Sequence, residues 1–304
     1  MSKAAPAAAT RCGFIAIIGI PNAGKSTLVN ALVGTKVSIV SRKVQTTRMP
    51  LRGIAMAGAS QLVFIDTPGI FAPRRRLERA MVDAAWAGAG DADLIVLVID
   101  AAKGVDEDVE RILARLPKSE GRLLLALNKI DRVQKERLLE LAQDLNARLP
   151  FAATFMISAL SGDGVAHLKA HLATAVPEGP WHYPADEVSD APLRMLAAEI
   201  TREKIYERLH DELPYQVAVE TTGWQEQKGG VRIDQTIYVK RDSQKVIVLG
   251  KGGRMIKQLS MLARTELTEI LEMPVHLFLF VKVREGWEDD PERYSDLGLG
   301  FPKE

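Results

Sequence analysis

One segment near the N-terminus has the residue types and spacing needed to hold a chain of phosphates. The run Gly19-Ile20-Pro21-Asn22-Ala23-Gly24-Lys25-Ser26 directly follows the apolar stretch FIAII, and a helical pattern opens at Thr27. Glycines let backbone N–H groups turn inward around phosphates, and a helix N-terminus adds positive potential there. The pattern predicts a P-loop in which Lys25 reaches the β- and γ-phosphates and the Ser26 hydroxyl binds Mg²⁺.

Three further motifs, each at the end of an apolar run, select the nucleotide. Asp66-Thr67-Pro68-Gly69 follows QLVFI, where Asp66 can hold Mg²⁺ through water and the Gly69 N–H can meet the γ-phosphate. Asn128-Lys129-Ile130-Asp131 follows RLLLAL, and its last carboxylate can accept hydrogen bonds from the N1–H and exocyclic amine of guanine. Adenine lacks that donor pair. Ser158-Ala159-Leu160 ends the next run, and its backbone N–H groups can meet the guanine carbonyl, so the four motifs predict GTP binding.

The motifs are positioned by strand patterns that alternate with helical stretches. The apolar runs are FIAIIG, QLVFID, LIVLVID, RLLLALN and TFMIS. Near-continuous apolar strands separated by helices indicate a mostly parallel sheet with helices on both faces, whose ligands bind at the carboxyl ends of the strands. We therefore predict an α/β P-loop domain over residues 13–176, preceded by a flexible N-terminal tail over residues 1–12.

The pattern changes beyond residue 176. Pro177, Gly179, Pro180 and Pro184 predict a linker over residues 177–190. Two amphipathic helical stretches, PLRMLAAEITREKIYERLHDEL and RMIKQLSMLARTELTEILE, then accompany three runs that read as strands, YQVAVETT, VRIDQTIYVKR and VHLFLFVKV. This mixture predicts a smaller α+β domain over residues 191–287, followed by an acidic C-terminal tail over residues 288–304.

Charge is segregated within the C-terminal half, although the formal net charge of the chain is only +1. Residues 228–264 contain nine basic and two acidic side chains, whereas residues 285–304 contain seven acidic and two basic ones. The basic stretch can meet phosphate, and a solvated charged face is the alternative interpretation. The single cysteine, Cys12, cannot form an internal disulfide, which fits a cytoplasmic protein, and no apolar run approaches the roughly 20 residues that span a bilayer.

The basic stretch contains a G-x-x-G loop, Gly250-Lys251-Gly252-Gly253, followed by Arg254 and Lys257. This segment resembles a KH domain of type II. The resemblance implies that the glycines let the backbone of about four unpaired nucleotides approach closely, while the lysines and arginine supply positive charge. Periodicity predicts a strand for VIVL at residues 246–249, but the resemblance implies a short helix there, and we adopt the helix.

Together the nucleotide motifs and the KH-like segment resemble the Era group of GTPases, whose P-loop carries the Pro21-Asn22 seen here. The resemblance extends from Phe14 to about Trp287. It implies hydrolysis of GTP to GDP and phosphate, Mg²⁺ bound by Ser26, Thr47 and Asp66, and action as a factor for assembly of the 30S ribosomal subunit. It also implies nucleotide-dependent binding to the 3′ end of 16S rRNA and peripheral contact with the cytoplasmic face of the inner membrane.

The same resemblance identifies Gln45-Thr46-Thr47-Arg48 as switch I, with Thr47 as the threonine that senses the γ-phosphate. The family usually has proline immediately before this motif, whereas this chain has Val44, which affects the rigidity of the loop more than metal binding. A Ras-like enzyme places a water-orienting glutamine after the Asp-Thr-Pro-Gly-type motif, but this chain has Ile70. An isoleucine cannot hydrogen-bond water, so we predict slow intrinsic hydrolysis completed by another group.

Two side chains are candidates for that group. Asn22 can help to coordinate a monovalent cation such as K⁺ beside the phosphates, as in related GTPases, and Arg48 lies in the switch. We favour Asn22; the alternative is that it only stabilises the loop. The catalytic set that we predict is Asn22, Lys25, Thr47 and Gly69.

Other functions are compatible with parts of the pattern. A membrane-associated signalling GTPase would use the KH-like domain to bind protein, although the basic loop argues against it. A GTP-dependent tRNA-modification enzyme would require an added catalytic domain. A non-hydrolysing RNA binder is compatible with Ile70, because isoleucine cannot orient the attacking water. His167 and His171 lack a third metal ligand at suitable spacing, and Trp224 and Tyr238 can either stack on bases or pack in a core. The oligomeric state is not encoded in any recognisable pattern.

Overall fold

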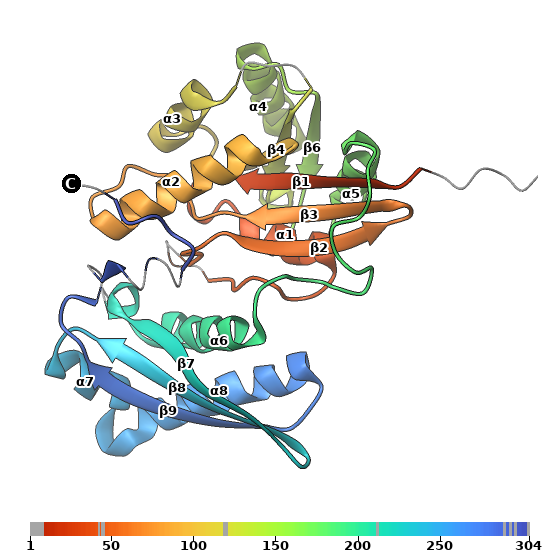
Figure 1. Cartoon of the computed structure of the whole chain (residues 1–304). Coiled ribbons are helices and arrows are strands. Elements are labelled where there is room, and N and C mark those ends of the chain that lie inside the picture. The colour runs from red at the N-terminus through yellow and green to blue at the C-terminus, as the bar shows by residue number, and fades with distance from the viewer. Residues whose placement is uncertain are drawn as a thin grey trace, which may run out of the picture. The chain divides into compact units, whose positions relative to one another are not determined.

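The computed structural model describes residues 9–41, 43, 46–117, 121–210, 213–287, 290–291, 294 and 297–302. Its internal contacts divide the chain into two compact units. The N-terminal unit comprises residues 1–38 and 47–190, and the C-terminal unit comprises residues 39–46 and 191–304. Figure 1 shows the elements of both units in chain order from red to blue.

The N-terminal unit is built on a six-stranded sheet with the strand order β2-β3-β1-β4-β5-β6. Its strands are β1 (Arg11–Ile18), β2 (Leu51–Ala57), β3 (Ser60–Asp66), β4 (Leu94–Asp100), β5 (Leu123–Asn128) and β6 (Ala153–Ile157). All neighbouring pairs are parallel except β2 and β3. The predicted α/β fold with a mostly parallel sheet is therefore confirmed.

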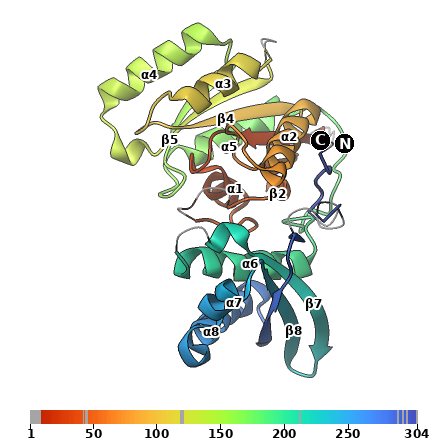
Figure 2. The ribbon, with the colours of Figure 1, turned by 90° about the vertical axis from the view of Figure 1, so that its left-hand side faces the viewer.

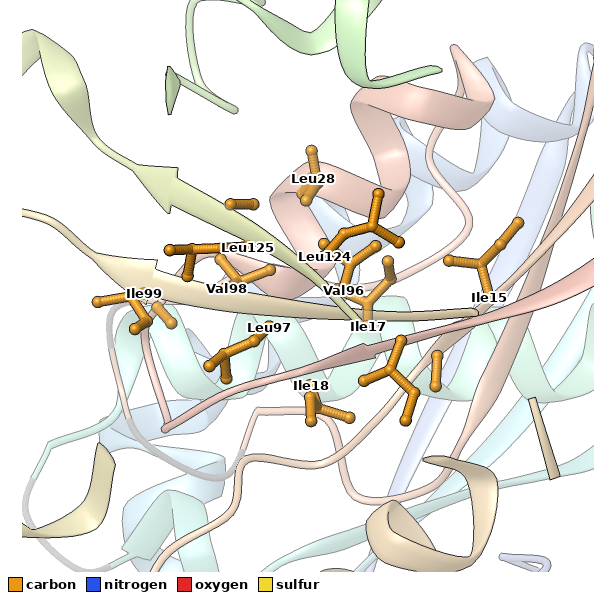
Figure 3. Packing of buried hydrophobic residues seen from close by; sticks show 14 of the residues in the cluster. Ile15, Ile17, Ile18, Leu28, Val96, Leu97, Val98, Ile99, Leu124 and Leu125 are labelled. Atoms are coloured by element: carbon orange, nitrogen blue, oxygen red, sulfur yellow. The ribbon is translucent and has the colours of Figure 1, made fainter. Parts of the chain in front are cut away.

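Helices cover both faces of this sheet. They are α1 (Lys25–Val33), α2 (Arg76–Asp91), α3 (Glu107–Arg115), α4 (Lys135–Arg148) and α5 (Val165–Ala175). Helices α1 and α5 contact each other on one face, and α2 lies across the other (Figures 1 and 2). Because both faces are covered, successive residues of the central strands are buried, which explains why these strands have continuous apolar runs. Figure 3 shows this core, where Ile15, Ile17 and Ile18 of β1, Val96, Leu97, Val98 and Ile99 of β4, Leu124 and Leu125 of β5, and Leu28 of α1 are labelled.

Strand β2 was not predicted. It is the antiparallel edge strand, and Arg52 and Gly53 interrupt its apolar pattern, so the local sequence gives little sign of a strand. Its pairing with β3 over seven residue pairs stabilises the strand, although the local strand propensity is low.

Two boundaries of the predicted nucleotide domain differ from the structure. Strand β1 begins at Arg11, so Arg11 and Cys12 lie in the sheet and not in the predicted tail, of which residues 1–8 lie outside the described residues. Residues 177–190, predicted as a linker, group with the N-terminal unit. The Cys12 N–H donates to the Pro177 carbonyl at 3.1 Å, and the Ile54 N–H donates to the Val188 carbonyl at 2.8 Å. This segment thus satisfies backbone groups that the sheet leaves unpaired.

The C-terminal unit has a three-stranded sheet in the order β7-β8-β9, with helices on one face. Its elements are α6 (Leu193–Arg208), β7 (Ala218–Gln227), β8 (Gly230–Val239), α7 (Asp242–Leu249), α8 (Arg254–Leu271) and β9 (Val275–Val283). Strands β7 and β8 are antiparallel, and β8 and β9 are parallel. The order α-β-β-α-α-β confirms the predicted KH-type α+β domain. In the predicted acidic tail, the described rings of Tyr294 and Phe301 pack edge to face, with centroids 4.9 Å apart.

Residues 246–249 form the last turn of helix α7, as the KH resemblance implied, and not the strand that their periodicity predicts. Val248 is buried against Leu259 of α8 and Val281 of β9, whereas Val246 and Ile247 are exposed. A strand would have alternated buried and exposed side chains, so the one-sided burial fits a short helix.

Candidate active site and nucleic-acid interface

The predicted P-loop connects β1 to α1 by a path that requires glycine at two positions. At Gly19, an added Cβ would lie 2.4 Å from the Val98 carbonyl oxygen. At Gly24, where φ is 101°, it would lie 2.2 Å from Asn128 Nδ2. Asn22 also adopts a positive φ of 63°, which asparagine tolerates better than most residues. The loop is therefore held in the tight conformation that allows backbone amides to surround an anion.

Lys25 begins helix α1 and is buried, with 6% of its surface exposed. Its Nζ donates hydrogen bonds to the carbonyls of Gly19 at 3.2 Å and Ile20 at 3.1 Å. Burial lowers the pKa of Lys25 to about 8, while the charge of Asp66 opposes the shift. A buried ammonium is stabilised by an anion, and the phosphates of a nucleotide would supply that charge.

Three oxygen-bearing side chains meet beside this lysine. The hydroxyl oxygens of Ser26 and Thr47 lie 2.9 Å apart, and the Thr47 hydroxyl donates to Asp66 Oδ2 at 3.3 Å. Asp66 is fully buried, and its Oδ1 has no hydrogen-bond partner within the described part of the chain. Burial raises the pKa of the Asp66 carboxyl, whereas Ser26 and Lys25 act to lower it. Hard oxygen ligands grouped around an unsatisfied carboxylate oxygen fit Mg²⁺.

The loops after β5 and β6 are tied to the P-loop by Asn128 and Lys129. Asn128 donates from Nδ2 to the Ala23 carbonyl at 2.8 Å and accepts at Oδ1 from the Ala159 N–H at 2.9 Å. Lys129 donates from Nζ to the Asn22 carbonyl at 2.7 Å and to Asp100 Oδ2 at 2.6 Å. Two side chains thus brace three loops at the carboxyl ends of parallel strands.

Asp131 lies in the short 3₁₀ helix Ile130–Arg132, and 41% of its side chain is exposed. Ser158 is buried at the end of β6, and Leu160 is 79% exposed. An exposed carboxylate next to the braced loops can accept hydrogen bonds from a purine edge that offers two donors. The residues predicted to contact guanine therefore lie at the carboxyl ends of the neighbouring strands β5 and β6.

The position where Ras-like enzymes carry glutamine points into the core. Ile70 is 4% exposed, and its N–H donates to the Gly19 carbonyl at 3.1 Å. An added Cβ at Gly69 would lie 2.7 to 2.9 Å from atoms of Pro21, so this glycine permits a close approach to the P-loop. The Ile70 side chain cannot orient water, as the sequence indicated.

The predicted switch I motif is described only in part. Val44 and Gln45 lie outside the described residues, whereas Thr46, Thr47 and Arg48 are described and the last two are buried. Thr47 belongs to the N-terminal unit, but residues 39–46 belong to the C-terminal unit.

Sequence reasoning missed the groups that hold residues 39–46 in the C-terminal unit. Glu203 of α6 accepts a hydrogen bond from the Val40 N–H at 2.6 Å. Arg202 of α6 is buried, donates to the Thr46 carbonyl and forms an ion pair with Glu199. Ile39 is buried among apolar residues of α6, β8 and α8. The signal in the sequence was the group of charged residues in the middle of this helix, Glu199, Arg202, Glu203 and Lys204, all of which the structure buries.

Asp100 was also missed, although it ends the run LIVLVID in the way that Asp66 ends QLVFID. It is 4% exposed and ion-paired with Lys129 at 2.6 Å. Its place opposite Asn128 in the register of β4 and β5 became evident only from the sheet.

The G-x-x-G loop lies between α7 and α8, where Gly250, Gly252 and Gly253 have φ values of 69°, 62° and 74°. An added Cβ at Gly250 would lie 2.7 Å from Met255 Cβ, whereas within the described chain nothing lies within 4 Å of one at Gly252 or Gly253. The side chains of Lys251, Arg254 and Lys257 are exposed at the start of α8. The loop thus presents positive charge and an open backbone to solvent. Trp224 packs against the core of the unit, which favours the packing interpretation for that residue.

The fold and the site define a P-loop GTPase joined to a KH domain. A family model described as "50S ribosome-binding GTPase" matches residues 14–129, and one described as "KH domain" matches residues 212–288.

Relatives extend the match to almost the whole chain. GTPase Era of Bradyrhizobium sp. strain BTAi1 is 61% identical over 302 residues, which cover 99% of this chain and 98% of the relative. GTPase Era of Rhizobium meliloti strain 1021 is 62% identical over 301 residues, covering 99% and 96%. The crystal structure of a single-residue variant of Aquifex aeolicus Era bound to GDP.AlF4- superposes with a TM-score of 0.90 at 36% identity, covering 95% of this chain and 99% of that one. The chain belongs to the Era family, and it is an RNA-binding enzyme that hydrolyses GTP. No helix in the described part of the chain is long and apolar enough to cross a membrane.

Proposed function

We propose that this GTPase acts in assembly of the 30S ribosomal subunit by binding the 3′ end of 16S rRNA in a nucleotide-dependent way. The observation that carries the proposal is the exposed G-x-x-G loop with its cationic side chains Lys251, Arg254 and Lys257. An Era that is 36% identical, with a TM-score of 0.90, was crystallised with MgGDPNP and nucleotides 1506-1542 of 16S ribosomal RNA. The family resemblance also implies peripheral contact with the inner membrane, which stays a prediction.

In this proposal, the loops at the carboxyl ends of the strands hold GTP. The phosphates contact Gly19, Pro21, Asn22, Ala23, Gly24, Lys25, Ser26 and Thr27, and guanine contacts Asn128, Lys129, Asp131, Ser158, Ala159 and Leu160. Ser26, Thr47 and Asp66 would hold Mg²⁺, and the ion would supply positive charge beside the phosphates. The grouping of their oxygens beside buried Lys25 supports this assignment.

The peptide bond between Thr46 and Thr47 connects the proposed nucleotide site to the RNA-binding unit. Thr47 contacts Asp66 in the N-terminal unit, while the preceding residue, Thr46, is bonded to Arg202 in the C-terminal unit. Contact with the γ-phosphate orders Thr47. The backbone of the neighbouring Thr46 moves with it, and the hydrogen bond from Arg202 transmits this movement to α6. Because this segment then has one conformation with GTP and another with GDP, the affinity of the C-terminal unit for RNA differs between the two nucleotide states.

Fluorescence anisotropy with a labelled RNA from the 3′ end of 16S rRNA tests the proposal directly. We expect the RNA to bind roughly 5- to 150-fold more tightly when the protein holds a GTP analogue than when it holds GDP. By linkage, the RNA must raise affinity for the GTP analogue, relative to GDP, by the same factor. A scrambled RNA of equal composition is the control. Equal affinities in both nucleotide states would contradict the proposed switch.

The lowered pKa of Lys25 predicts a pH dependence of nucleotide binding. Its free-protein pKa is about 8, and bound phosphates would raise that pKa, so binding takes up a proton at higher pH. Affinity for GDP should be constant well below pH 8 and fall by up to about tenfold per pH unit above it. Calorimetric titration in two buffers of different ionisation enthalpy measures the proton uptake. Lys25→Arg is the control, because a guanidinium stays charged and its profile should remain flat across this range.

Monovalent cations test the proposed role of Asn22 in hydrolysis. We expect GTP hydrolysis to be at least about tenfold faster in K⁺ than in Na⁺ at equal ionic strength, since a cation beside the phosphates can act as an arginine finger does. Asn22→Gly keeps the positive φ of this position and removes the amide, so it should bind GTP yet lose the preference for K⁺. Equal rates in the two salts for the wild-type protein would exclude a catalytic role for the cation. The group that completes the hydrolytic site would then be Arg48 or a residue of a bound partner.

A further inference from the structure

The outer face of the sheet in the C-terminal unit carries two exposed phenylalanines. Helices α6, α7 and α8 pack against the opposite face, and both views show the three helices on the same side of the sheet (Figures 1 and 2). Side chains alternate along β9, so Leu277 and Val281 are buried toward the helices while Phe278 and Phe280 point outward. These two rings remain 44% and 51% exposed.

Polar side chains and charged side chains of both signs surround the rings on the same face. In the parallel register, Arg232 lies opposite His276, Asp234 opposite Phe278, and Tyr238 opposite Lys282. The Arg232 guanidinium lies over the Phe278 ring, 4.5 Å from its centroid, and is bonded to both carboxylate oxygens of Asp234 at 3.1 and 3.0 Å. The outer-face patch is here defined as Arg232, Tyr238, His276, Phe278, Phe280 and Lys282.

The composition of this patch distinguishes it from an ordinary exposed apolar residue. Single apolar side chains on a surface are normal and need no explanation. Here two aromatic rings stand two positions apart on one strand, and a guanidinium and an ammonium flank them. The carboxylate of Asp234 is already paired with Arg232, so it contributes little free negative charge.

That combination matches unpaired nucleic acid better than it matches an apolar protein surface. Bases stack on aromatic rings whatever their sequence, and the connecting phosphates need cations nearby. Sheets of RNA-recognition domains use aromatic residues on neighbouring positions of one face in this way. An apolar partner would instead bury the Lys282 ammonium, which is unfavourable unless the partner supplies a counter-charge.

We propose that the outer-face patch is a second RNA contact, separate from the G-x-x-G loop, in which Phe278 and Phe280 each stack on an unpaired base. A base that stacks on Phe278 takes the place of the Arg232 guanidinium over the ring. The guanidinium keeps its hydrogen bonds to Asp234 through Nε and Nη2 and donates from Nη1 to a phosphate, while Lys282 pairs with a phosphate at the other end of the patch. The inference rests on RNA binding by the C-terminal unit as proposed above and adds a surface to it. It implies that a longer RNA binds more tightly than the few nucleotides held by the loop.

Two RNAs of different length test the inference in the full-length protein bound to a GTP analogue. One is about five nucleotides long, enough for a G-x-x-G loop, and the other is a single strand of about 20 nucleotides that contains the same sequence. Phe278→Ala and Phe280→Ala should each weaken binding of the long RNA by about fivefold or more and leave the short RNA unaffected. Phe280→Tyr keeps an aromatic ring and should retain binding.

Matched variants separate the patch from the loop. Met273→Ala removes another exposed apolar side chain, 42% exposed in the turn before β9, and should change neither affinity. Gly252→Asp should abolish binding of the short RNA, so a failure of loop binding is distinguishable from a failure of the patch. If the double variant Phe278→Ala/Phe280→Ala binds the long RNA as tightly as the wild type does, the inference is wrong.

Two measurements on the wild-type protein do not depend on these substitutions. Ultraviolet cross-linking of the long RNA, followed by mass spectrometry, should place cross-links on Phe278 or Phe280, and their absence would overturn the proposal. Sedimentation velocity tests whether a second copy of the chain, instead of RNA, covers this face. A wild-type dimer that dissociates in the double variant would assign the patch to a second copy of the chain and would also overturn it.

Discussion

Replacing Asp131 with asparagine is expected to convert a guanine site into one that prefers xanthine. The Asp131 carboxylate is 41% exposed, and in the proposed site it would accept hydrogen bonds from the two adjacent donors of guanine. Asparagine offers one acceptor and one donor at the same place, so the guanine amine loses its partner and faces an N–H group. Two charge-assisted hydrogen bonds are worth about 3 to 6 kcal/mol together, so GTP affinity should fall by at least about 100-fold.

Xanthine carries a carbonyl where guanine carries the amine, and it therefore matches the asparagine. Titration of labelled GDP and xanthosine diphosphate against wild-type protein and Asp131→Asn measures both affinities. The variant should keep its fold, because the Asp131 side chain is 41% exposed and its ion pair with Arg132 is long, at 3.7 Å. Retention of wild-type GDP affinity by this variant would show that another group reads the base.

The second large effect is expected at Gly252, where aspartate should abolish RNA binding. Within the described chain, an added Cβ at Gly252 meets nothing within 4 Å, and aspartate tolerates the positive φ of 62° better than most side chains do. The substitution therefore places a negative charge between Lys251 and Arg254 without disturbing the unit. Loss of a close phosphate approach and repulsion together should weaken RNA binding by about 100-fold or more.

Gly252→Asn separates the contribution of charge from that of bulk, because its side chain has the same shape as aspartate and no charge. We expect an intermediate affinity for this variant by anisotropy and unchanged GTP hydrolysis without RNA for both variants. If Gly252→Asp and wild type bind RNA equally, RNA does not use the loop. If the asparagine variant is as weak as the aspartate variant, steric exclusion accounts for the whole effect.

Much of the nucleotide site is local in sequence and could be predicted from it. A P-loop needs glycines, a lysine and a hydroxyl within eight consecutive residues, between a strand and a helix, and Gly19 to Ser26 meet that need by themselves. The strand runs, the helical spacing and the KH-like order of elements follow from patterns of the same short range. The short helix α7 is the exception, because a run of four apolar residues fits either a strand or a buried helix turn, and family resemblance was needed to choose.

Contacts between distant residues were decided by the tertiary structure alone. Asn128 binds the Ala23 carbonyl across 105 positions, and Asp100 pairs with Lys129 only because β4 and β5 lie in one register. Strand β2 exists because β3 offers it a partner, and its own residues are weakly strand-forming. No local periodicity contains such pairings, since they depend on how the strands are ordered in the sheet.

The assignment of residues 39–46 to the C-terminal unit is of the same kind. The sequence IVSRKVQT gives no sign of a partner helix. The burial of Ile39, the hydrogen bond that Glu203 accepts from Val40 and the one that Arg202 donates to Thr46 place these three residues on α6. Likewise, alternation along VHLFLFVKV predicts that one face is exposed, but only the packing of all three helices on the other face leaves Phe278 and Phe280 uncovered. The sequence by itself determined the chemistry of the nucleotide loops and the class of each domain. The tertiary structure decided which distant groups brace those loops and which surfaces stay open, because burial and hydrogen-bond partners are set by the packing of whole elements.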